Sequence, residues 1–113
     1  MHNCIFCKIV NNELPSNKVY EDEDLLAFED INPVAPVHIL LIPKKHINSL
    51  AELSEKDYEV ASRLLLVASK LGNEHCNNNG YRIVSNVGED GGQEVNHLHL
   101  HILGGRSMTW PPG

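Results

Sequence analysis

The chain has 113 residues, of which 42% are hydrophobic and 21% charged, as in an ordinary globular protein, and we place residues 1–113 in a single domain. Its formal net charge of −6 argues against a general nucleic-acid-binding protein, because such proteins carry a basic patch or stripe. No apolar run approaches the roughly 18 residues of a transmembrane helix, and the N-terminal residues lack the basic and apolar pattern of a signal peptide. We therefore expect a cytoplasmic protein, with the nucleus as an alternative location, that binds neither nucleic acid nor membranes.

The first half of the chain predicts a short helix followed by three strands. Apolar residues recur at helical spacing over residues 4–10, and two asparagines and Pro15 end this pattern. Residues 18–22 and 25–30 predict two strands joined by a tight acidic turn. A loop containing two prolines then leads to a strongly apolar strand at residues 37–42.

The second half predicts one long helix and two further strands. Ser54 is followed by acidic residues, as at a helix N-terminus, and apolar residues recur at helical spacing over residues 55–76, although Gly72 weakens the last turn. Residues 81–87 and 97–103 predict the last strands, joined by a polar, glycine-rich loop. The fold class is therefore α+β: a five-stranded antiparallel sheet with one long and one short helix.

Two of the predicted strands are apolar on both faces. Residues 25–28 and 39–42 show no polar alternation, which suits central strands covered on both sides. Since one main helix cannot cover both faces of a sheet, the pattern favours a homodimer. A monomer with a well-buried sheet is the alternative, and periodicity alone does not decide between them.

The last predicted strand carries three histidines that alternate with apolar residues. On a strand, His97, His99 and His101 would project from one face about 6.5–7 Å apart, close enough to surround one small anionic group. Near neutral pH, histidine can act as a base, an acid, a nucleophile or a metal ligand. A solvated His-rich face or a tag-like metal tract is the alternative, but neither needs the strict apolar interleaving. The pattern therefore predicts a functional site on this strand.

A second group of candidate ligands begins with the pair Cys4 and Cys7. Two thiolates at this spacing can bind one metal ion, and His46 and His97 would complete a tetrahedral set of two cysteines and two histidines. The rival interpretations are a thioredoxin-like redox pair, although no βαβ pattern surrounds it, and two unrelated thiols. We expect structural zinc, because four protein ligands leave no open position on the metal.

Several segments together resemble the histidine triad (HIT) family of nucleotide-binding proteins. The main match is Gly91-Gly92-Gln93 followed by His97-Leu98-His99-Leu100-His101-Ile102-Leu103-Gly104-Gly105-Arg106. Upstream, the matching segments are Phe28-Glu29-Asp30-Ile31-Asn32-Pro33 and His38 with Ile42-Pro43-Lys44-Lys45-His46. The ending Trp110-Pro111-Pro112-Gly113 is similar to that of the Hint branch, which includes adenosine phosphoramidases. The resemblance covers Cys4 to Gly113 and implies a HIT fold and a homodimer.

This resemblance implies a hydrolase that binds a purine nucleotide of the AMP or GMP type. The enzyme would cleave purine nucleoside phosphoramidates, or related nucleoside 5′-monophosphate esters, after His99 attacks the α-phosphorus to form a covalent nucleotidyl-histidine. His101 would bind or neutralise the phosphate oxygens, and His38 would support the triad from the neighbouring strand. Imidazole chemistry agrees independently, because histidine is largely neutral and nucleophilic near pH 7. For His38 taken alone, a satisfied core histidine is an equally good interpretation.

The resemblance also implies the contacts to the nucleotide. Asp30 would accept hydrogen bonds from the ribose hydroxyls, although an acid at a strand end is also common before a turn. Backbone N–H groups near residues 93–95 would bind the phosphate, and Trp110 lies in a tail that would reach toward the partner's site. The apolar members of the set would form a slot around the base, or would simply be core. The expected nucleotide-binding residues are Ile5, Phe6, Phe28, Asp30, Ile31, Asn86, Gln93, Glu94, Val95, His99, His101 and Trp110.

Two residues depart from the family pattern. Glu94 stands where Hint phosphoramidases typically carry a serine that contacts the leaving group, and Glu29 stands where histidine is frequent. Because Glu94 adds a negative charge near the expected phosphate site, the resemblance does not fix the leaving-group preference or the catalytic rate. Two alternatives therefore accompany the phosphoramidase: a dinucleoside polyphosphate hydrolase, against which the ending at residues 110–113 argues, and a weakly catalytic, zinc-stabilised nucleotide-binding or interaction module.

Overall fold

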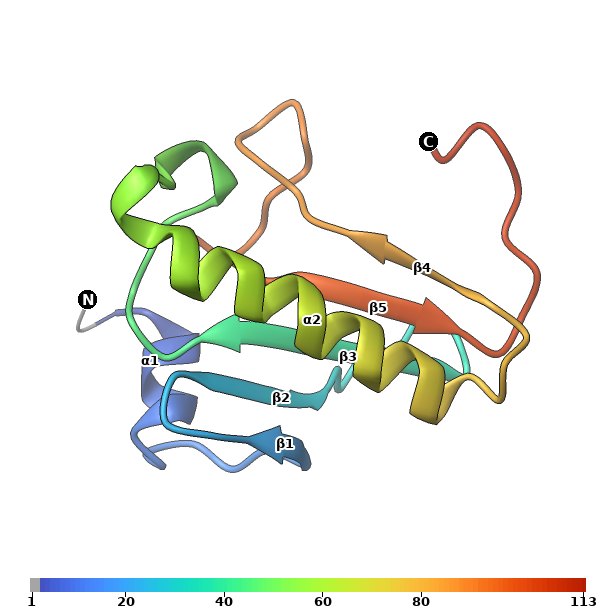
Figure 1. The fold of residues 1–113 in the computed structure, drawn as a ribbon, viewed down its shortest axis with the longest axis horizontal. Coiled ribbons are helices and arrows are strands. Elements are labelled where there is room, and N and C mark those ends of the chain that lie inside the picture. The colour runs from blue at the N-terminus through green and yellow to red at the C-terminus, as the bar shows by residue number, and fades with distance from the viewer. Residues whose placement is uncertain (1–2) are drawn as a thin grey trace.

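A computed structural model describes residues 3–113 and shows a five-stranded antiparallel sheet in the order β1-β2-β3-β5-β4, with the helix α2 crossing one face (Figure 1). The helices are α1 (Ile5–Val10) and α2 (Tyr58–His75), and two short 3₁₀ turns, Leu50–Glu52 and Glu55–Asp57, precede α2. The strands are β1 (Lys18–Glu21), β2 (Leu25–Glu29), β3 (Val37–Pro43), β4 (Tyr81–Val84) and β5 (Leu100–Gly104). The predicted α+β class, with five strands and one long and one short helix, is confirmed. Among the described residues, no helix is long and apolar enough to cross a membrane.

The central strands β2 and β3 are buried on both faces, but within a single chain. One face packs against the apolar stripe of α2 in a core that includes Leu41 and Leu71. On the other face, Phe6 and Ile9 of α1 pack against Phe28 and neighbouring apolar residues. Because the short helix supplies the second cover, the double-sided apolar pattern does not by itself require a second chain, and the homodimer stays a prediction.

The last strand begins later than its sequence predicts. The ladder between β4 and β5 starts at the pair Val84 and His101, so β4 also ends three residues before its predicted limit. Next to this point, the Ser85 hydroxyl donates to the carbonyl of His99 at 2.9 Å, so a side-chain hydrogen bond replaces the backbone pairing between the strands. The preceding segment is instead tied to the chain after β3, since the N–H of Leu98 donates to the Ile47 carbonyl at 2.6 Å.

Helix α2 also differs from its prediction at its start, and it contains a glycine for a packing reason. Residues Glu55–Asp57 form a 3₁₀ turn in which Ser54 and Asp57 make a reciprocal capping box, and the α-helix begins after it. At Gly72, a Cβ would lie 2.4 Å from the Tyr81 ring, so only glycine lets β4 approach the helix this closely.

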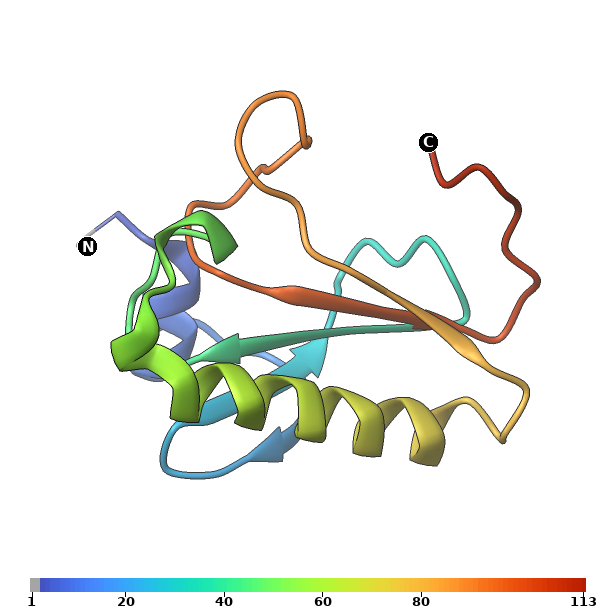
Figure 2. The ribbon, with the colours of Figure 1, turned by 45° about the horizontal axis from the view of Figure 1, so that its top comes forward.

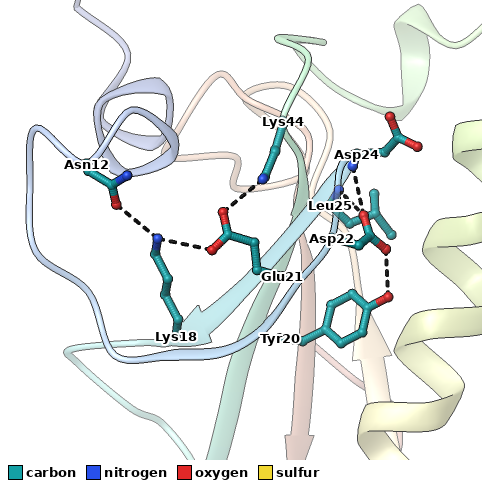
Figure 3. A network of polar contacts seen from close by, with 8 residues as sticks. All are labelled: Asn12, Lys18, Tyr20, Glu21, Asp22, Asp24, Leu25 and Lys44. Carbon is teal, nitrogen blue, oxygen red and sulfur yellow. Dashed lines mark hydrogen bonds and ion pairs between the residues drawn. The ribbon is translucent and has the colours of Figure 1, made fainter.

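A polar network holds the edge strand β1 against the sheet (Figure 3). The ammonium group of Lys18 donates to Asn12 at 2.9 Å and to Glu21 at 3.2 Å, while Lys44 at the end of β3 pairs with Glu21 at 2.8 Å. The predicted acidic turn is confirmed, because the Asp22 carboxylate accepts two backbone N–H groups at 2.8 Å each. These contacts hold β1 at its edge of the sheet. The loops that follow β2 and β4 lie on the face of the sheet opposite α2 (Figure 2).

Candidate functional site

A cleft of about 630 Å³ opens on the face of the sheet opposite α2. It combines the apolar side of α1 with a polar group formed by Asp30, His38 and His101. Of the predicted nucleotide-binding and catalytic residues, those that line this cleft are Ile5, Phe6, Phe28, Asp30, Ile31, His38, Asn86, Glu94, Val95 and His101.

The sequence reasoning missed further lining residues, notably Ile9 and residues 14–16. Ile9 lies one helical turn after Ile5, so the helical spacing could have placed both on the cleft. Nothing in the local pattern of residues 14–16 signals that this connection folds back against the cleft. Its Ser16 hydroxyl oxygen is buried and has no hydrogen-bond partner among the described residues.

All three triad histidines lie on the α1 side, although only His101 lies inside β5. The Phe6 ring meets the rings of His97 and His99 edge-on, with centroids 5.9 and 5.2 Å apart. The intervening apolar residues Leu98, Leu100 and Ile102 are buried in the core beneath α2. The alternation predicted from the sequence is therefore correct, even though the regular strand starts only at Leu100.

Hydrogen bonds fix the proton positions in the pair His38 and His101. The backbone N–H of Val34 donates to Nδ1 of His38 at 3.1 Å, so a neutral His38 carries its proton on Nε2. This Nε2 lies 2.9 Å from Nδ1 of His101 and 3.3 Å from a carboxylate oxygen of Asp30. When it donates to His101, the proton of His101 must sit on its own Nε2, which becomes a donor for a group in the cleft.

Burial keeps both members of this pair neutral near pH 7. Desolvation lowers the pKa of His38 against the opposing effect of Asp30. Desolvation, together with the neighbouring His99 and His38, lowers the pKa of His101 to about 4. An N–H dipole, rather than a full positive charge, therefore faces the cleft.

His99 is oriented differently from His101. It is buried, and its Nδ1 lies 2.7 Å from the carbonyl oxygen of His97. Since a carbonyl only accepts, Nδ1–H donates and the lone pair is on Nε2. The ring does not line the cleft itself but contacts His101, with centroids 4.9 Å apart. This geometry provides a lone pair next to an N–H donor.

The predicted metal ligands Cys4, Cys7, His46 and His97 come together in one cluster, with their ligand atoms all within 4.8 Å of one another. Nδ1 of His97 lies 3.3 Å from Sγ of Cys4 and 3.6 Å from Sγ of Cys7, and Nδ1 of His46 lies 3.3 Å from Sγ of Cys7. A tetrahedron with Zn–S bonds of about 2.3 Å and Zn–N bonds of about 2.0 Å has S···N edges of about 3.5 Å. The cluster therefore fits the size of a zinc site.

Outer hydrogen bonds aim the two imidazoles of this cluster inward. Nε2–H of His97 donates to the Pro43 carbonyl at 2.8 Å, and Nε2–H of His46 donates to the Asn48 side-chain oxygen at 2.7 Å. Both rings are left with a lone pair on Nδ1, the arrangement that metal-binding histidines require.

The thiol chemistry of the cluster argues against a redox pair. Burial and the adjacent Cys4 raise the pKa of Cys7 to about 11, whereas a redox-active thiol has a lowered pKa. The two thiols are also unbridged in the structure.

The remaining predicted residues, Gln93 and Trp110, do not line the cleft. Gln93 braces the loop before β5: its side chain donates to the carbonyls of Asn48 and Val95 at 2.7 and 3.0 Å. Its backbone N–H already donates to Gly88, so only the N–H groups of Glu94 and Val95 are left without a partner among the described residues. Trp110 is 82% exposed in the isolated chain.

The buried histidines predict a loss of stability in mild acid. The folded chain holds the pKa of His101 near 4 against an ordinary 6.5, so the unfolded chain takes up the proton first as the pH falls. This contribution to the free energy of unfolding is fully present above pH 6.5 and is lost as the pH falls toward 4. In urea unfolding at about pH 7 and about pH 5, we expect His101→Gln to lose less stability than the parent chain.

The matched control is His75→Gln, at the exposed end of α2, which should lose as much stability in acid as the parent. An equal acid loss in His101→Gln and the parent would show that His101 does not titrate in this way.

Comparisons with known proteins agree with this geometry. The chain matches the family model described as HIT domain over residues 11–108. The crystal structure of a HIT family hydrolase from Legionella pneumophila Philadelphia 1 is 53% identical with a TM-score of 0.94, covering 98% of this chain and 100% of that one. A histidine triad protein from Clostridium difficile is 49% identical with a TM-score of 0.90, covering 96% of each chain.

A third relative is the 14 kDa zinc-binding protein of Zea mays, which is 50% identical over 111 residues, 96% of this chain and 87% of that protein. The family model spans residues 11–108, which include His38, His46 and the three triad histidines, and each of the three relatives matches at least 96% of the chain. The chain therefore belongs to the HIT domain family.

Proposed function

We propose that the chain is a HIT-family hydrolase that cleaves purine nucleoside phosphoramidates, or related nucleoside 5′-monophosphate esters, through a covalent nucleotidyl-histidine on His99. The observation that carries the proposal is the fixed pair of ring protons: His99 keeps a lone pair on Nε2, and the adjacent His101 keeps a proton on its own Nε2. A nucleophile next to a donor for developing negative charge is what displacement at phosphorus needs. The hydrolase name of the Legionella relative supports the reaction class, and the Trp-Pro-Pro-Gly ending supports the Hint branch.

The cleft supplies contacts for each part of an AMP- or GMP-type nucleotide. The base would lie against the apolar residues Phe6 and Phe28, whose rings meet edge-on at 5.5 Å. Asp30 accepts one backbone N–H from Asn32 at 2.8 Å and lies near His38, which leaves lone pairs of its carboxylate for ribose hydroxyls. The free N–H groups of Glu94 and Val95 would donate to the phosphate.

The reaction follows from these positions in two displacements. Nε2 of His99 forms a bond to phosphorus as the P–N bond to the leaving amine breaks, and the amine leaves with a proton taken up from solvent. His101 donates its Nε2–H to a phosphate oxygen throughout, which stabilises the negative charge on phosphorus. Water then attacks the phosphorus and releases one proton to solvent, the P–Nε2 bond breaks, and the nucleoside monophosphate leaves with His99 restored to its neutral form. One difficult step is thereby divided into two easier ones.

A weakly catalytic nucleotide-binding module is the second candidate. Glu94 favours it, because this exposed carboxylate lines the same cleft that would hold the phosphate. A dinucleoside polyphosphate hydrolase is a third reading of the same histidines. Comparing the turnover of an adenosine phosphoramidate with that of a dinucleoside polyphosphate separates all three.

Replacing the nucleophile tests the reaction directly. We expect His99→Ala to lose at least about a thousandfold in turnover of an adenosine phosphoramidate, because the covalent path is removed. Circular dichroism should show a folded chain, and the exposed control His75→Ala should keep the parent rate. Near-parental turnover by a contaminant-free His99→Ala preparation would refute the covalent mechanism, and mass spectrometry should find the nucleotide on His99 in the parent.

We further propose that the cysteine–histidine cluster holds one structural zinc ion per chain. The zinc-binding name of the maize relative and the fit of the S···N distances support this assignment. Bound zinc would stabilise the thiolate forms of the two cysteines and crosslink three segments: the start of α1, the chain after β3 and the chain before β5.

Metal analysis tests the zinc site. Protein made without a metal-binding tag should contain one zinc per chain, Cys4→Ser should lose it, and Cys76→Ser, a buried thiol outside the cluster, should retain it. Chelation should lower the melting temperature more than it lowers kcat, because the ligands are all structural. A zinc content near zero after zinc-supplemented expression would exclude the site.

We also propose a homodimer, as the resemblance to the Hint branch implies. Support comes from unpartnered surfaces: α2 leaves Leu65 and Leu66 about two-thirds exposed, at 65% and 67%, and β4 forms an open edge of the sheet (Figure 1). A second copy would cover such surfaces, and the exposed tail with Trp110 would then lie near the partner.

Light scattering at micromolar concentration should give twice the chain mass of 12.6 kDa. Leu65→Glu with Leu66→Glu should shift the mass toward the monomer, whereas Glu74→Lys on the same helix should not. A monomeric parent would refute the dimer.

A further inference from the structure

We propose that a second pocket beside the metal cluster is a subsite for the leaving group, and that Glu94 makes it prefer amines that carry an additional positive charge. The inference rests on the proposed function, because it concerns the part of the substrate beyond the scissile P–N bond. It adds a chemical class of substrate that the nucleotide cleft alone does not specify.

The second pocket adjoins the nucleotide cleft. It measures about 390 Å³ and lies over the start of α1 and the chain after β3. Ile5, Glu94 and Val95 line both cavities and so form a common wall between them. A ligand bound in the cleft can therefore extend across this wall into the pocket.

The position of the phosphorus directs the leaving group to that wall. With the base against α1 and the phosphorus beside His101, which lines the cleft and contacts His99, the nucleoside would fill the apolar part of the cleft. The polar remainder of the lining includes Glu94, and we place the departing amine on this side of the cleft. The loop that carries Glu94 is held in place, because the side chain of Gln93 makes three hydrogen bonds within 3.0 Å across it.

Glu94 is the one acidic side chain among the described residues that line this pocket, and these residues include no lysine or arginine. The side chain is exposed and forms no ion pair within the described part of the chain, where the salt bridges involve other acids. The other carboxylates of the cleft, Glu29 and Asp30, do not reach this pocket.

The neighbouring metal cluster does not offset this charge. A zinc ion held by two thiolates and two neutral imidazoles has no net charge, and the metal-free cluster with protonated thiols has none either. The remaining walls are polar but uncharged, from Asn3, Asn48 and Asn96. An ammonium group on the leaving amine would therefore meet one carboxylate among uncharged amide side chains.

Three matched substrates test the subsite. They are adenosine 5′-phosphoramidates whose leaving amines have equal chain length and end in an ammonium, a methyl or a carboxylate group. We expect kcat/KM to fall in that order, with about a two- to fivefold step each time, the effect of an exposed ion pair. The steps should shrink as salt is added, since exposed charges are screened.

Glu94→Gln should bring the ammonium-to-methyl ratio close to one, because the substitution keeps the shape and removes the charge. The matched control is Glu89→Gln: Glu89 is exposed in the same loop but lines neither cavity, so the ratios should persist. Equal ratios in the parent and in Glu94→Gln would overturn the subsite while leaving the hydrolase intact.

If none of the three compounds is hydrolysed, the proposed function fails. The subsite is then tested separately by measuring the binding of compounds that cannot be hydrolysed. The probes are adenosine 5′-alkylphosphonates with the same three ends, in which carbon replaces the scissile nitrogen. Calorimetry should show that the parent binds the ammonium-ended compound more tightly than the methyl-ended one, and that Glu94→Gln does not. Equal binding of both compounds by the parent would overturn the subsite.

Discussion

The hydrogen bond that each imidazole makes with a fixed backbone or amide group is the constraint on which the rest of the site depends. A histidine can present a lone pair from either nitrogen, and its neighbours decide which. The carbonyl of Pro43 holds the proton of His97, so that its lone pair faces the cysteines, and the carbonyl of His97 in turn holds the proton of His99. One chain of backbone contacts thus separates the proposed metal ligand His97 from the proposed nucleophile His99, only two residues apart.

Helix α1 connects the two centres. Its six residues are too few to be stable alone, so its position depends on what it contacts. Phe6 packs against Phe28, His97 and His99, while Cys4 at its N-cap and Cys7 in its first turn contribute the thiols. The same short helix and its N-cap therefore cover the sheet, form the apolar wall of the cleft and supply both thiols of the proposed metal site, so a displacement of the helix would disturb all three.

Much of the fold and the site follows from the sequence, and the failures have physical causes. Alternation of histidine with leucine placed the triad on one face, and the cysteine spacing found the cluster, because both are local patterns. The late start of β5 was missed because it depends on Ser85 and Ile47, which lie far away along the chain. The double-sided apolar strands do not by themselves require a dimer, because α1, a helix too short to be counted as cover, packs on the second face. Proton positions were equally out of reach, since they are set by tertiary contacts such as that between Val34 and His38.

The distribution of charge explains how an acidic chain with a net charge of −6 can offer a site for a phosphate. Among residues 3–113, no lysine or arginine lines the cleft, and burial keeps His38 and His101 uncharged near pH 7. The attraction for an anion must then come from N–H dipoles whose directions are fixed before the ligand arrives: the ring of His101 and the backbone at Glu94 and Val95. Fixed dipoles need no counter-ion, and salt screens the distant surface acids, so the negative charges that oppose a phosphate are chiefly the carboxylates of the cleft itself, Glu29, Asp30 and Glu94. In the proposed reaction, the contact of Nδ1–H with the His97 carbonyl leaves the lone pair on Nε2 of His99 available for the phosphorus, beside the neutral N–H donor of His101.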